Sequence, residues 1–361
     1  MSDRTALVTG GAGFIGSRLS RDLVAAGFDV VVADVLHPQV HAEPGWPAAL
    51  APGVRPYPVD VTSPTQCDAL VRLVRPDLVV HLAAETGTGQ SLTEASRHAL
   101  VNVAGTAQIL DAFTRTGHVP EHIVLTSSRA VYGEGRWATA AGTPFYAATR
   151  GTAQLDAHEW NPTDRDGTLA GAVPCPHRAE DTEPRPSNVY AATKLAQEHL
   201  LGAWTSAMGS TLSILRLQNV YGPGQSLSNP YTGIVSLFAT RGLRGEAIEV
   251  YEEGGILRDF VYIDDVVRAI MLCVDRPDTG LLLTDIGSGN RVSLLEVAEF
   301  VAERTGSPAP VLSTRYRPGD VRAASADIDH AGKALGYMPE VDVRSGLQLL
   351  LNWIQDIHDR N

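Results

Sequence analysis

A glycine-rich loop lies within the first sixteen residues, directly after a short apolar run. The run is Ala6-Leu7-Val8, and the loop reads Thr9-Gly10-Gly11-Ala12-Gly13-Phe14-Ile15-Gly16. Gly10 lets the chain turn off a strand, Gly13 lets a ligand approach the backbone, and Gly16 lets the next helix lie against the sheet. Free N–H groups at the start of a helix bind phosphate oxygens. The loop therefore predicts a strand, a phosphate-binding turn and a helix, although a turn that binds nothing would show the same glycines.

A second apolar run favours the binding interpretation and narrows the ligand. It spans Val30 to Ala33 and ends at Asp34, where an acid would accept hydrogen bonds from the ribose hydroxyls of a dinucleotide. The same carboxylate would repel a 2′-phosphate, so we predict NAD rather than NADP. In this part of the chain the predicted cofactor-binding residues are Gly10, Gly13, Phe14, Ile15, Gly16, Asp34 and Val35.

Length and charge limit the classes of partner. With 361 residues the chain is longer than one typical domain, so we expect a nucleotide-binding domain and a smaller one. The net charge of −12 argues against a nucleic-acid or membrane-surface partner, because both attract a surplus of Lys and Arg. An anionic ligand must then be held by a few local cations.

The sequence also points to the compartment. The first residues carry no apolar leader, and no segment has eighteen uninterrupted apolar residues, so we expect a cytoplasmic protein. The three cysteines, Cys67, Cys175 and Cys273, form no close pair, so neither a disulfide framework nor a metal site is expected.

Apolar runs alternate with amphipathic segments through the first two thirds of the chain. The runs are Ala6 to Val8, Val30 to Ala33, a segment ending at Val59, Leu78 to Leu82, Ile123 to Leu125 and Leu212 to Leu217. This rhythm is typical of a doubly wound α/β fold, a Rossmann-type parallel sheet with helices on both faces. Several runs end in small or polar residues, and ligands bind at the carboxyl ends of such strands.

The rhythm gives a domain plan. We expect a Rossmann domain over residues 1–219, to which residues 260–288 return, and a smaller C-terminal α/β substrate domain formed by residues 220–259 and 289–361. The smaller domain would contain helices near Leu294 to Glu303 and Val343 to Ile357. Residues 135–187 are too long for an ordinary connection and form an insertion, which is either a surface excursion or a substrate lid.

Tyr190 and Lys194 stand four residues apart at the start of a predicted helix that runs to about Met208. They therefore share one helix face. A free phenol has a pKa of about 10 and is a poor base at neutral pH, but a neighbouring ammonium stabilises the phenolate. Ser128, at the end of the fifth apolar run, can donate a hydrogen bond to a substrate oxygen. We predict Ser128, Tyr190 and Lys194 as the catalytic set.

An ordered series of motifs resembles the extended short-chain dehydrogenase/reductase family that modifies nucleotide sugars. Besides the glycine loop and Tyr190 to Lys194, it comprises Asp60-Val61, His81-Leu82-Ala83-Ala84, Asn102 to Thr106, Ser127-Ser128, Val131-Tyr132-Gly133, Asn219 to Pro223 and Arg258 to Val261. The resemblance implies tightly held NAD, a nucleotide-diphosphate (NDP) sugar as substrate, and further cofactor contacts from Asp60, Val61, Leu82, Ala83, Ala84, Asn102, Ser127, Tyr190 and Lys194.

The resemblance also implies the substrate contacts Thr86, Ser128, Asn219, Arg258 and Arg317. Two arginines can neutralise a diphosphate through paired hydrogen bonds, which gives a physical reason for the last two. The alternative for Arg258 is a surface ion pair with Asp259 or Asp264.

Residues after Ser128 separate the reactions of this family. Its 4,6-dehydratases carry an Asp-Glu pair there, whereas this chain has Arg129-Ala130, and the cysteine of the GDP-fucose-forming enzymes is absent at this point. The remaining Ser, Tyr and Lys suffice for reversible oxidation at one carbon, so we expect a 4-epimerase. The open alternatives are another NDP-sugar modifier, such as a UDP- or GDP-sugar 4-epimerase or a 4-ketoreductase, and a non-catalytic NAD-sensing protein.

Shorter motifs are similar to the group that interconverts dTDP-L-rhamnose and dTDP-6-deoxy-L-talose. They are Leu36 to His41, Gly87 to Ser91, Tyr132 to Gly135 and Leu227 to Gly233. That group often has two spaced cysteines in its insertion, and this chain keeps only Cys175.

A homodimer is also expected. In relatives the helices that correspond to Ser96 to Phe113 and Tyr190 to Met208 pair across a two-fold axis. In this chain they carry Leu100, Val103, Leu110, Leu195 and Leu201, which is more apolar surface than one sheet face needs.

Overall fold

The computed structural model describes residues 4–41, 45–163, 171–227, 229, 233–274 and 280–360, and a seven-stranded parallel sheet lies at its centre. The strands follow the order β14-β9-β5-β4-β1-β2-β3, in which β3, β2, β1, β4 and β5 form the order of a doubly wound dinucleotide-binding sheet. Their bounds are β1 (Thr5–Thr9), β2 (Asp29–Asp34), β3 (Arg55–Pro58), β4 (Leu78–His81), β5 (His122–Ser128), β9 (Thr211–Leu217) and β14 (Leu281–Ile286). The predicted fold class is confirmed.

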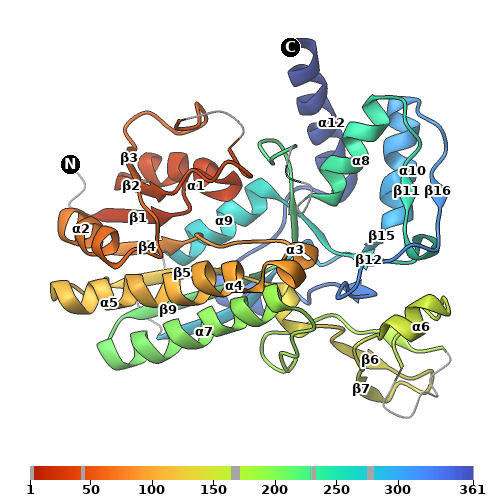
Figure 1. Cartoon of the computed structure of the whole chain (residues 1–361), viewed down its shortest axis with the longest axis horizontal. Coiled ribbons are helices and arrows are strands. Elements are labelled where there is room, and N and C mark those ends of the chain that lie inside the picture. The colour runs from red at the N-terminus through yellow and green to blue at the C-terminus, as the bar shows by residue number, and fades with distance from the viewer. Residues whose placement is uncertain are drawn as a thin grey trace.

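Helices cover both faces of this sheet, because successive apolar strand residues point to opposite sides. Ala6 and Val8 face one core, with α1 (Phe14–Ala25) and α9 (Ile263–Val274), while Leu7 faces the other. The second core is closed by α2 (Pro64–Val74), α5 (Thr106–Thr116) and α7 (Val189–Met208). Figure 1 shows α1 and α9 above the sheet and α5 and α7 below it.

The helix predicted over Ser96 to Phe113 is not continuous. It consists of α4 (Ala95–His98), a π-helical segment η1 (Ala99–Gly105) and then α5. Within η1 the buried Asn102 side chain accepts from the Glu85 backbone N–H at 2.7 Å and donates to the Glu85 carbonyl and the Thr193 hydroxyl. The wide turn therefore ties the segment after β4 to α7, and π-turns are frequent at functional sites.

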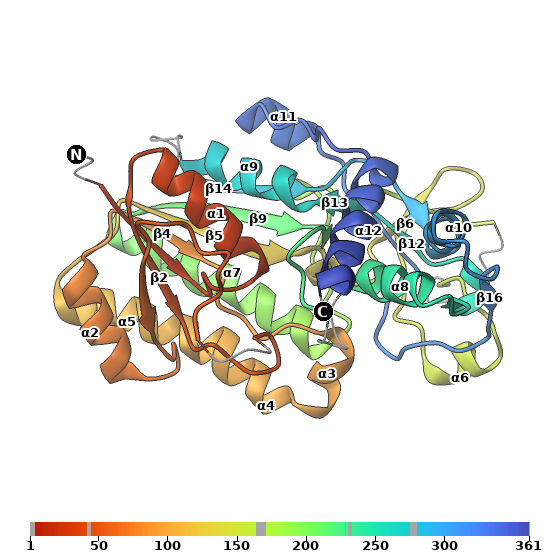
Figure 2. The same ribbon diagram turned by 90° about the horizontal axis from the view of Figure 1, so that it is seen from above.

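A smaller lobe follows the Rossmann sheet and shares one of its cores. Its helices are α8 (Ile234–Leu243), α10 (Leu294–Thr305), α11 (Asp329–Leu335) and α12 (Val343–Arg360). Its short strands form three small sheets. In these, β10 (Asn219–Tyr221) pairs with β13 (Phe260–Tyr262), β11 (Glu249–Val250) pairs with β16 (Val311–Leu312), and β12 (Leu257–Arg258) pairs with both β15 (Val292–Ser293) and β17 (Ala323–Ala324). Tyr221, Phe260 and Tyr262 join the core on the α1 side of the sheet to α8 and α12. Figure 2 shows α8, α10 and α12 beside the sheet.

The insertion between β5 and α7 forms a small three-stranded antiparallel sheet. It contains β6 (Arg136–Ala138), β7 (Pro144–Tyr146), α6 (Thr152–Asp156) and β8 (Val173–Pro174). A backbone N–H of His177 donates to Ser325 at 2.7 Å, and the Asp327 N–H donates back to His177 at 2.9 Å. The insertion is thus hydrogen-bonded to the smaller lobe along its backbone.

No helix in the described part of the chain is long and apolar enough to cross a membrane.

Candidate active site

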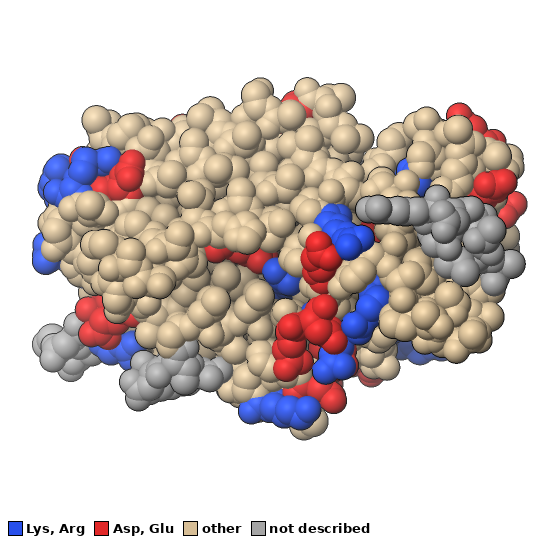
Figure 3. Space-filling model, turned by 90° about the horizontal axis from the view of Figure 1, so that it is seen from below, with Lys and Arg blue, Asp and Glu red and all other residues tan. Residues whose placement is uncertain are grey.

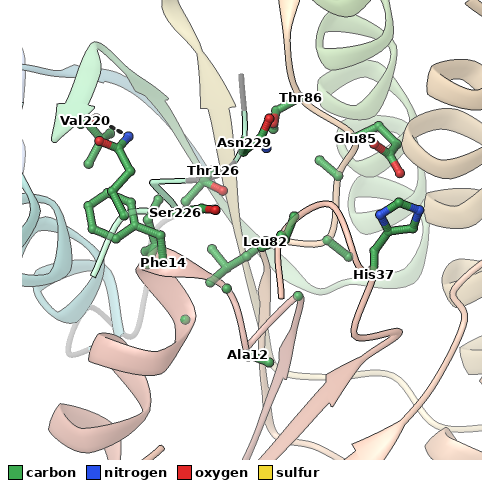
Figure 4. Close-up of a pocket in the computed structure, with 18 of the residues that line it drawn as sticks. Ala12, Phe14, His37, Leu82, Glu85, Thr86, Thr126, Val220, Ser226 and Asn229 are labelled. Atoms are coloured by element: carbon green, nitrogen blue, oxygen red, sulfur yellow. Dashed lines mark hydrogen bonds between the residues drawn. The ribbon is translucent and has the colours of Figure 1, made fainter. Parts of the chain in front are cut away.

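A cavity of about 630 Å³ opens at the carboxyl ends of the central strands. Figure 4 shows Phe14 of the glycine loop on one side of the cavity and His37 and Glu85 on the other, and Thr86 and Asn229 also line it. Most of the predicted residues line it, namely Gly10, Gly13, Phe14, Ile15, Gly16, Asp34, Val35, Asp60, Val61, Leu82, Ala83, Ala84, Thr86, Ser127, Ser128, Tyr190, Lys194 and Asn219. The fold therefore brings the predicted cofactor and catalytic residues into one space.

The glycine loop has the shape that a dinucleotide needs. Gly10 has a φ of +67°, and a Cβ there would lie 2.7 Å from the backbone N of Ala83. A Cβ at Gly13 would lie 3.2 Å from the Gly10 carbonyl oxygen, and one at Gly16 would collide with the Gly11 backbone. Gly10 and Gly16 admit only glycine and Gly13 leaves little room for a side chain, so backbone forms the floor, as phosphate binding requires.

Asp34 is held at the end of β2 by two backbone donors. Its carboxylate accepts from the N–H of Ala12 at 3.1 Å and from that of Leu36 at 2.8 Å. Leu36 takes a φ of +54°, an uncommon conformation for a branched residue, to make this turn. The acid therefore lies directly beside the glycine loop, in the position from which ribose hydroxyls can be held.

Ser128 and Tyr190 meet at the cavity wall. Ser128 ends β5, and Tyr190 lies in the first turn of α7, whose Asn188 cap accepts from the Ala191 N–H at 2.9 Å. Burial raises the pKa of the Tyr190 phenol, while its hydrogen bond with Ser128 and the positive charge of Arg129 act to lower it. The phenol is thus desolvated and has two neighbours that favour the phenolate.

Lys194 lies one turn further along α7 and is buried. Burial lowers the pKa of its ammonium to about 7, against the opposing effect of Glu198. Its Nζ donates to the Gln197 side chain, whose Nε2 donates to the Thr106 hydroxyl at 2.9 Å. The sequence predicted an ammonium beside the phenol, whereas here Lys194 is fixed by Gln197 and Arg129 supplies the positive charge that acts on Tyr190.

Arg129 is the residue of the site that sequence reasoning missed as a functional group. It follows Ser128 directly and lies half-buried in the short helix η2 (Arg129–Tyr132), which packs against α7. Burial and the charge of Arg258 lower the pKa of its guanidinium to about 10. Within the described residues its side chain makes no hydrogen bond or ion pair, although its charge acts on Tyr190 and Arg258. Its place next to Ser128 was the available signal.

Three predicted residues lie outside the cavity lining. Asn102 is directed at Glu85 and Thr193, as described above. Arg258 is buried, and its guanidinium donates to Asp320 at 2.6 Å and to the Val321 carbonyl at 2.7 Å. Arg317 is exposed, with its guanidinium 5.7 Å from the Tyr251 ring centroid.

The alternative for Arg258, a surface pair with Asp259 or Asp264, is wrong. Asp259 accepts from Ser288 at 2.8 Å, and Asp264 pairs with Arg18. The reason is the position of Arg258 in β12, which is paired on both sides and directs its side chain into the lobe.

Buried polar atoms on the lobe side of the cavity have no hydrogen-bond partner among the described residues. The amide Oδ1 of Asn219 and both side-chain polar atoms of Gln218 are buried and have no hydrogen bond among the described residues. Both residues line the cavity. Because buried polar groups are nearly always satisfied, these amides indicate that a polar ligand completes the site. Of the motif Leu227 to Gly233, residues 228 and 230–232 lie outside the described residues.

Comparison with known proteins places these features in a family. Residues 6–155 and 167–286 match the family described as NAD dependent epimerase/dehydratase. A dTDP-L-rhamnose 4-epimerase from Burkholderia thailandensis is 50% identical over 354 residues, which cover 98% of this chain and 96% of that protein. The crystal structure of UDP-glucose 4-epimerase from Thermotoga maritima with UDP-glucose has a TM-score of 0.79 at 28% identity, covering 98% of this chain and 99% of its own.

A second solved structure contains the cofactor. MoeE5 in complex with UDP-glucuronic acid and NAD has a TM-score of 0.77 at 31% identity, and the match covers 98% of this chain and 99% of that one. The resemblance predicted from the motifs and the prediction of NAD as cofactor are both confirmed. This chain belongs to the NAD dependent epimerase/dehydratase family.

Proposed function

We propose that the protein is an NAD-dependent 4-epimerase of an NDP-sugar, with dTDP-L-rhamnose and dTDP-6-deoxy-L-talose as the interconverted pair. The observation that carries the proposal is the convergence of Ser128, Tyr190 and Lys194 on the same cavity as the glycine loop. The sugar and base are inferred from the Burkholderia relative. A NAD-sensing protein without chemistry would need neither the buried phenol nor its hydrogen-bonded serine.

The chain's residues supply the proton chemistry. The Tyr190 phenolate would accept the proton of the sugar C4 hydroxyl, while Ser128 hydrogen-bonds the same oxygen. Bound NAD supplies reversible hydride acceptance at C4. A 4-keto sugar that turns its opposite face before reduction emerges as the C4 epimer, and Tyr190 then returns the proton. Arg129 would keep positive charge near the phenol, and Lys194 lines the cavity one helical turn away.

We assign the diphosphate to the boundary between the two lobes. Asn219 lines the cavity there and its side-chain NH2 can donate to a phosphate oxygen. The Arg129 guanidinium lies next to Ser128, and Arg258 lies close enough to Arg129 to lower the pKa of its guanidinium. This assignment keeps residues 1–219 with 260–288 as the NAD-binding domain and gives residues 220–259 and 289–361 to the substrate. It is supported by β14, which pairs with β9 at the edge of the central sheet.

We further propose a homodimer through α7 and η1. The charged side chains of α7, Lys194 and Glu198, are both buried, so its accessible positions are uncharged. Leu100 on η1 is 53% exposed, whereas Leu110 and Leu201, which the sequence assigned to the same surface, are buried in the protein's own core. Figure 3 views the molecule from the side of α5 and α7, and much of that face is free of charged residues. Light scattering at micromolar concentration should give twice the mass of the chain.

The decisive experiment follows hydrogen at C4. In deuterated water, dTDP-L-rhamnose should equilibrate with its C4 epimer by NMR without gaining carbon-bound deuterium, and C4-deuterated substrate should keep its label. Wash-in of deuterium would indicate an enolate at C3 or C5, and consumption of external NADH or NADPH in proportion to product would indicate a ketoreductase. Either outcome excludes the 4-epimerase. Parallel assays with UDP- and GDP-sugars test the base and sugar separately from the reaction.

A further inference from the structure

A buried cluster of four charges joins the insertion to both lobes. Arg150, from the insertion, pairs with Glu134 at 2.8 Å and with Glu252 at 2.7 Å, and Arg322 completes the cluster at 3.2 Å from Glu252. The side chains of Arg150, Glu134 and Glu252 are 1%, 2% and 0% exposed. Two positive and two negative charges balance, so each residue depends on the others for its solvation.

The cluster fixes one short segment of the substrate lobe at both ends. Arg150 Nη2 donates to the Asp320 carbonyl at 3.0 Å, and the Arg322 backbone N–H donates to Glu134 at 2.9 Å. The same segment, residues 320–322, supplies the Arg258 guanidinium with the Asp320 carboxylate and the Val321 carbonyl as acceptors. The orientation of Arg258 therefore depends on where Arg150 and Glu134 hold residues 320–322.

Backbone strain accompanies the contact. Glu252 and Glu253 are consecutive non-glycine residues with φ of 50° and 53°, a conformation that costs free energy unless surrounding contacts fix it. The Glu252 carboxylate reaches Arg150, and the Glu253 carboxylate accepts from Trp160 Nε1 at 2.9 Å. Both strained glutamates thus bind residues of the insertion.

We propose that Arg150 is a positioning residue for Arg258, and through it for the substrate diphosphate, so that the insertion is a brace for the substrate lobe. The inference rests on the proposed function, because it takes Arg258 to act on a nucleoside diphosphate. A surface excursion would not bury an arginine between two glutamates, and a lid would have to break these ion pairs each time it opened.

The test compares Arg150→Lys with Arg136→Met. Lysine keeps the charge but cannot donate to Glu134, Glu252 and Asp320 together. Arg136 lies in the same insertion, and its ion pair with Asp181 is partly exposed, which makes it the matched control. Calorimetric titration uses dTDP or UDP, whichever the unchanged protein binds more tightly, and steady-state kinetics and the content of bound NAD are measured on the same samples.

Arg150→Lys should weaken nucleoside diphosphate binding and raise KM about tenfold or more, with kcat within about threefold and bound NAD unchanged, because the diphosphate contact is made equally in the ground state and the transition state. Arg136→Met should behave as the unchanged protein. Equal diphosphate affinity in folded, NAD-loaded Arg150→Lys would overturn the proposal. A fall in kcat at constant KM would do so too, because the cluster would then act on Ser128 or Tyr190.

Two further measurements keep the test independent of folding and of the substrate. If Arg150→Lys does not fold, Trp160→Phe removes the donor to Glu253 together with part of the ring stacked on His158, and should give a smaller loss of affinity in the same direction. If the unchanged protein binds neither diphosphate, the proposed function is wrong. Hydrogen exchange of residues 317–322 then tests whether the insertion holds this segment. Exchange of the backbone amides there should be faster in Arg150→Lys and unchanged in Arg136→Met.

Discussion

The two halves of the cavity are built in different ways. The nucleotide half is lined by the glycine loop, Asp34, Asp60-Val61 and Leu82 to Ala84 at the ends of neighbouring strands, and it presents mainly backbone and small residues. The substrate half is lined by Ser128 and by residues 218–221 and 224–226, and behind this lining the ion pairs of Arg150 with Glu134 and Glu252 and of Arg258 with Asp320 hold the supporting segments together. A backbone cradle tolerates no added Cβ, whereas a charge cluster tolerates no missing partner.

Because the two halves are built differently, different substitutions should disrupt them. The nucleotide half does not tolerate an added methyl group at Gly10 or Gly16, because a Cβ there would meet backbone atoms that cannot move aside. The substrate half rests on ion pairs such as Arg150 with Glu134 and Glu252, and removing one partner of a buried pair costs about 3–5 kcal/mol. Changes in the first half should therefore act on NAD, and changes in the second on the sugar nucleotide.

The largest effect is expected from Gly10→Ala. The added Cβ would meet the Ala83 backbone at 2.7 Å in a left-handed conformation, so the protein should lose bound NAD and with it all turnover. Gly202→Ala is the matched control: its Cβ meets nothing within 4 Å in the middle of α7, and the change should stabilise by about 0.5–1 kcal/mol. Cofactor released on denaturation measures the first and thermal unfolding the second. Retained NAD in Gly10→Ala would contradict a backbone-built nucleotide half.

Tyr190→Phe should give the next largest effect. The ring keeps its packing and loses the proton acceptor, so kcat should fall by about 10²- to 10⁴-fold while bound NAD stays in place. Kinetics and NAD content on one preparation check both parts. If turnover stays near normal, the base is another residue, and if NAD is lost, the phenol oxygen is needed to hold the cofactor as well as to move the proton.

The same contrast explains what could be predicted from the sequence. The glycine loop, Asp34, Ser128, Tyr190 and Lys194 act through local geometry or fixed spacing, so their types and positions were sufficient. The substrate half was not accessible in this way, because Arg150 and Glu252 lie 102 positions apart and nothing local to either indicates the other.

Two further features could not be predicted for the same reason, because they depend on contacts between residues that are distant in the sequence. Arg258 was predicted from its motif, but its partner Asp320 depends on how the lobe folds. The π-turn at Asn102 depends on contacts with Glu85 and Thr193, which belong to other elements.

Substitution of Arg129 tests whether a residue of the substrate half also sets the pKa of the Tyr190 base. Its charge lowers the pKa of Tyr190, so Arg129→Met should raise that pKa, and the acid limb of the pH–rate profile should move to higher pH. A lost charge interaction of about 1–2 kcal/mol at a half-buried site corresponds to about a tenfold loss of rate at neutral pH, recovered as pH rises. Arg129→Lys keeps the charge and should keep the profile. An unshifted limb in Arg129→Met would confine Arg129 to binding.

The smallest effect is expected for His177. Its substitution tests whether this histidine makes the folding stability of the substrate half sensitive to acid. Burial, reinforced by Arg129, Arg216, Arg258 and Arg136, lowers the pKa of His177 to about 3 from an ordinary value of 6.5. The unfolded chain therefore binds this proton first, so the stability contributed by neutral His177 is complete above pH 6.5 and is lost as pH falls towards 3.

His177→Phe should remove this dependence. The His177 ring centroid lies 4.4 Å from that of Tyr132, and its Nδ1 has no hydrogen bond among the described residues. Phenylalanine should therefore lower the unfolding free energy only slightly at pH 7.5. Between pH 7.5 and 5 the unchanged protein should lose about 2 kcal/mol more unfolding free energy than His177→Phe, as measured by urea titration. His358→Gln, an exposed change in α12, should lose as much as the unchanged protein. Equal losses in all three would move the acid sensitivity to the nucleotide half, where buried His81 also has a pKa lowered to about 3.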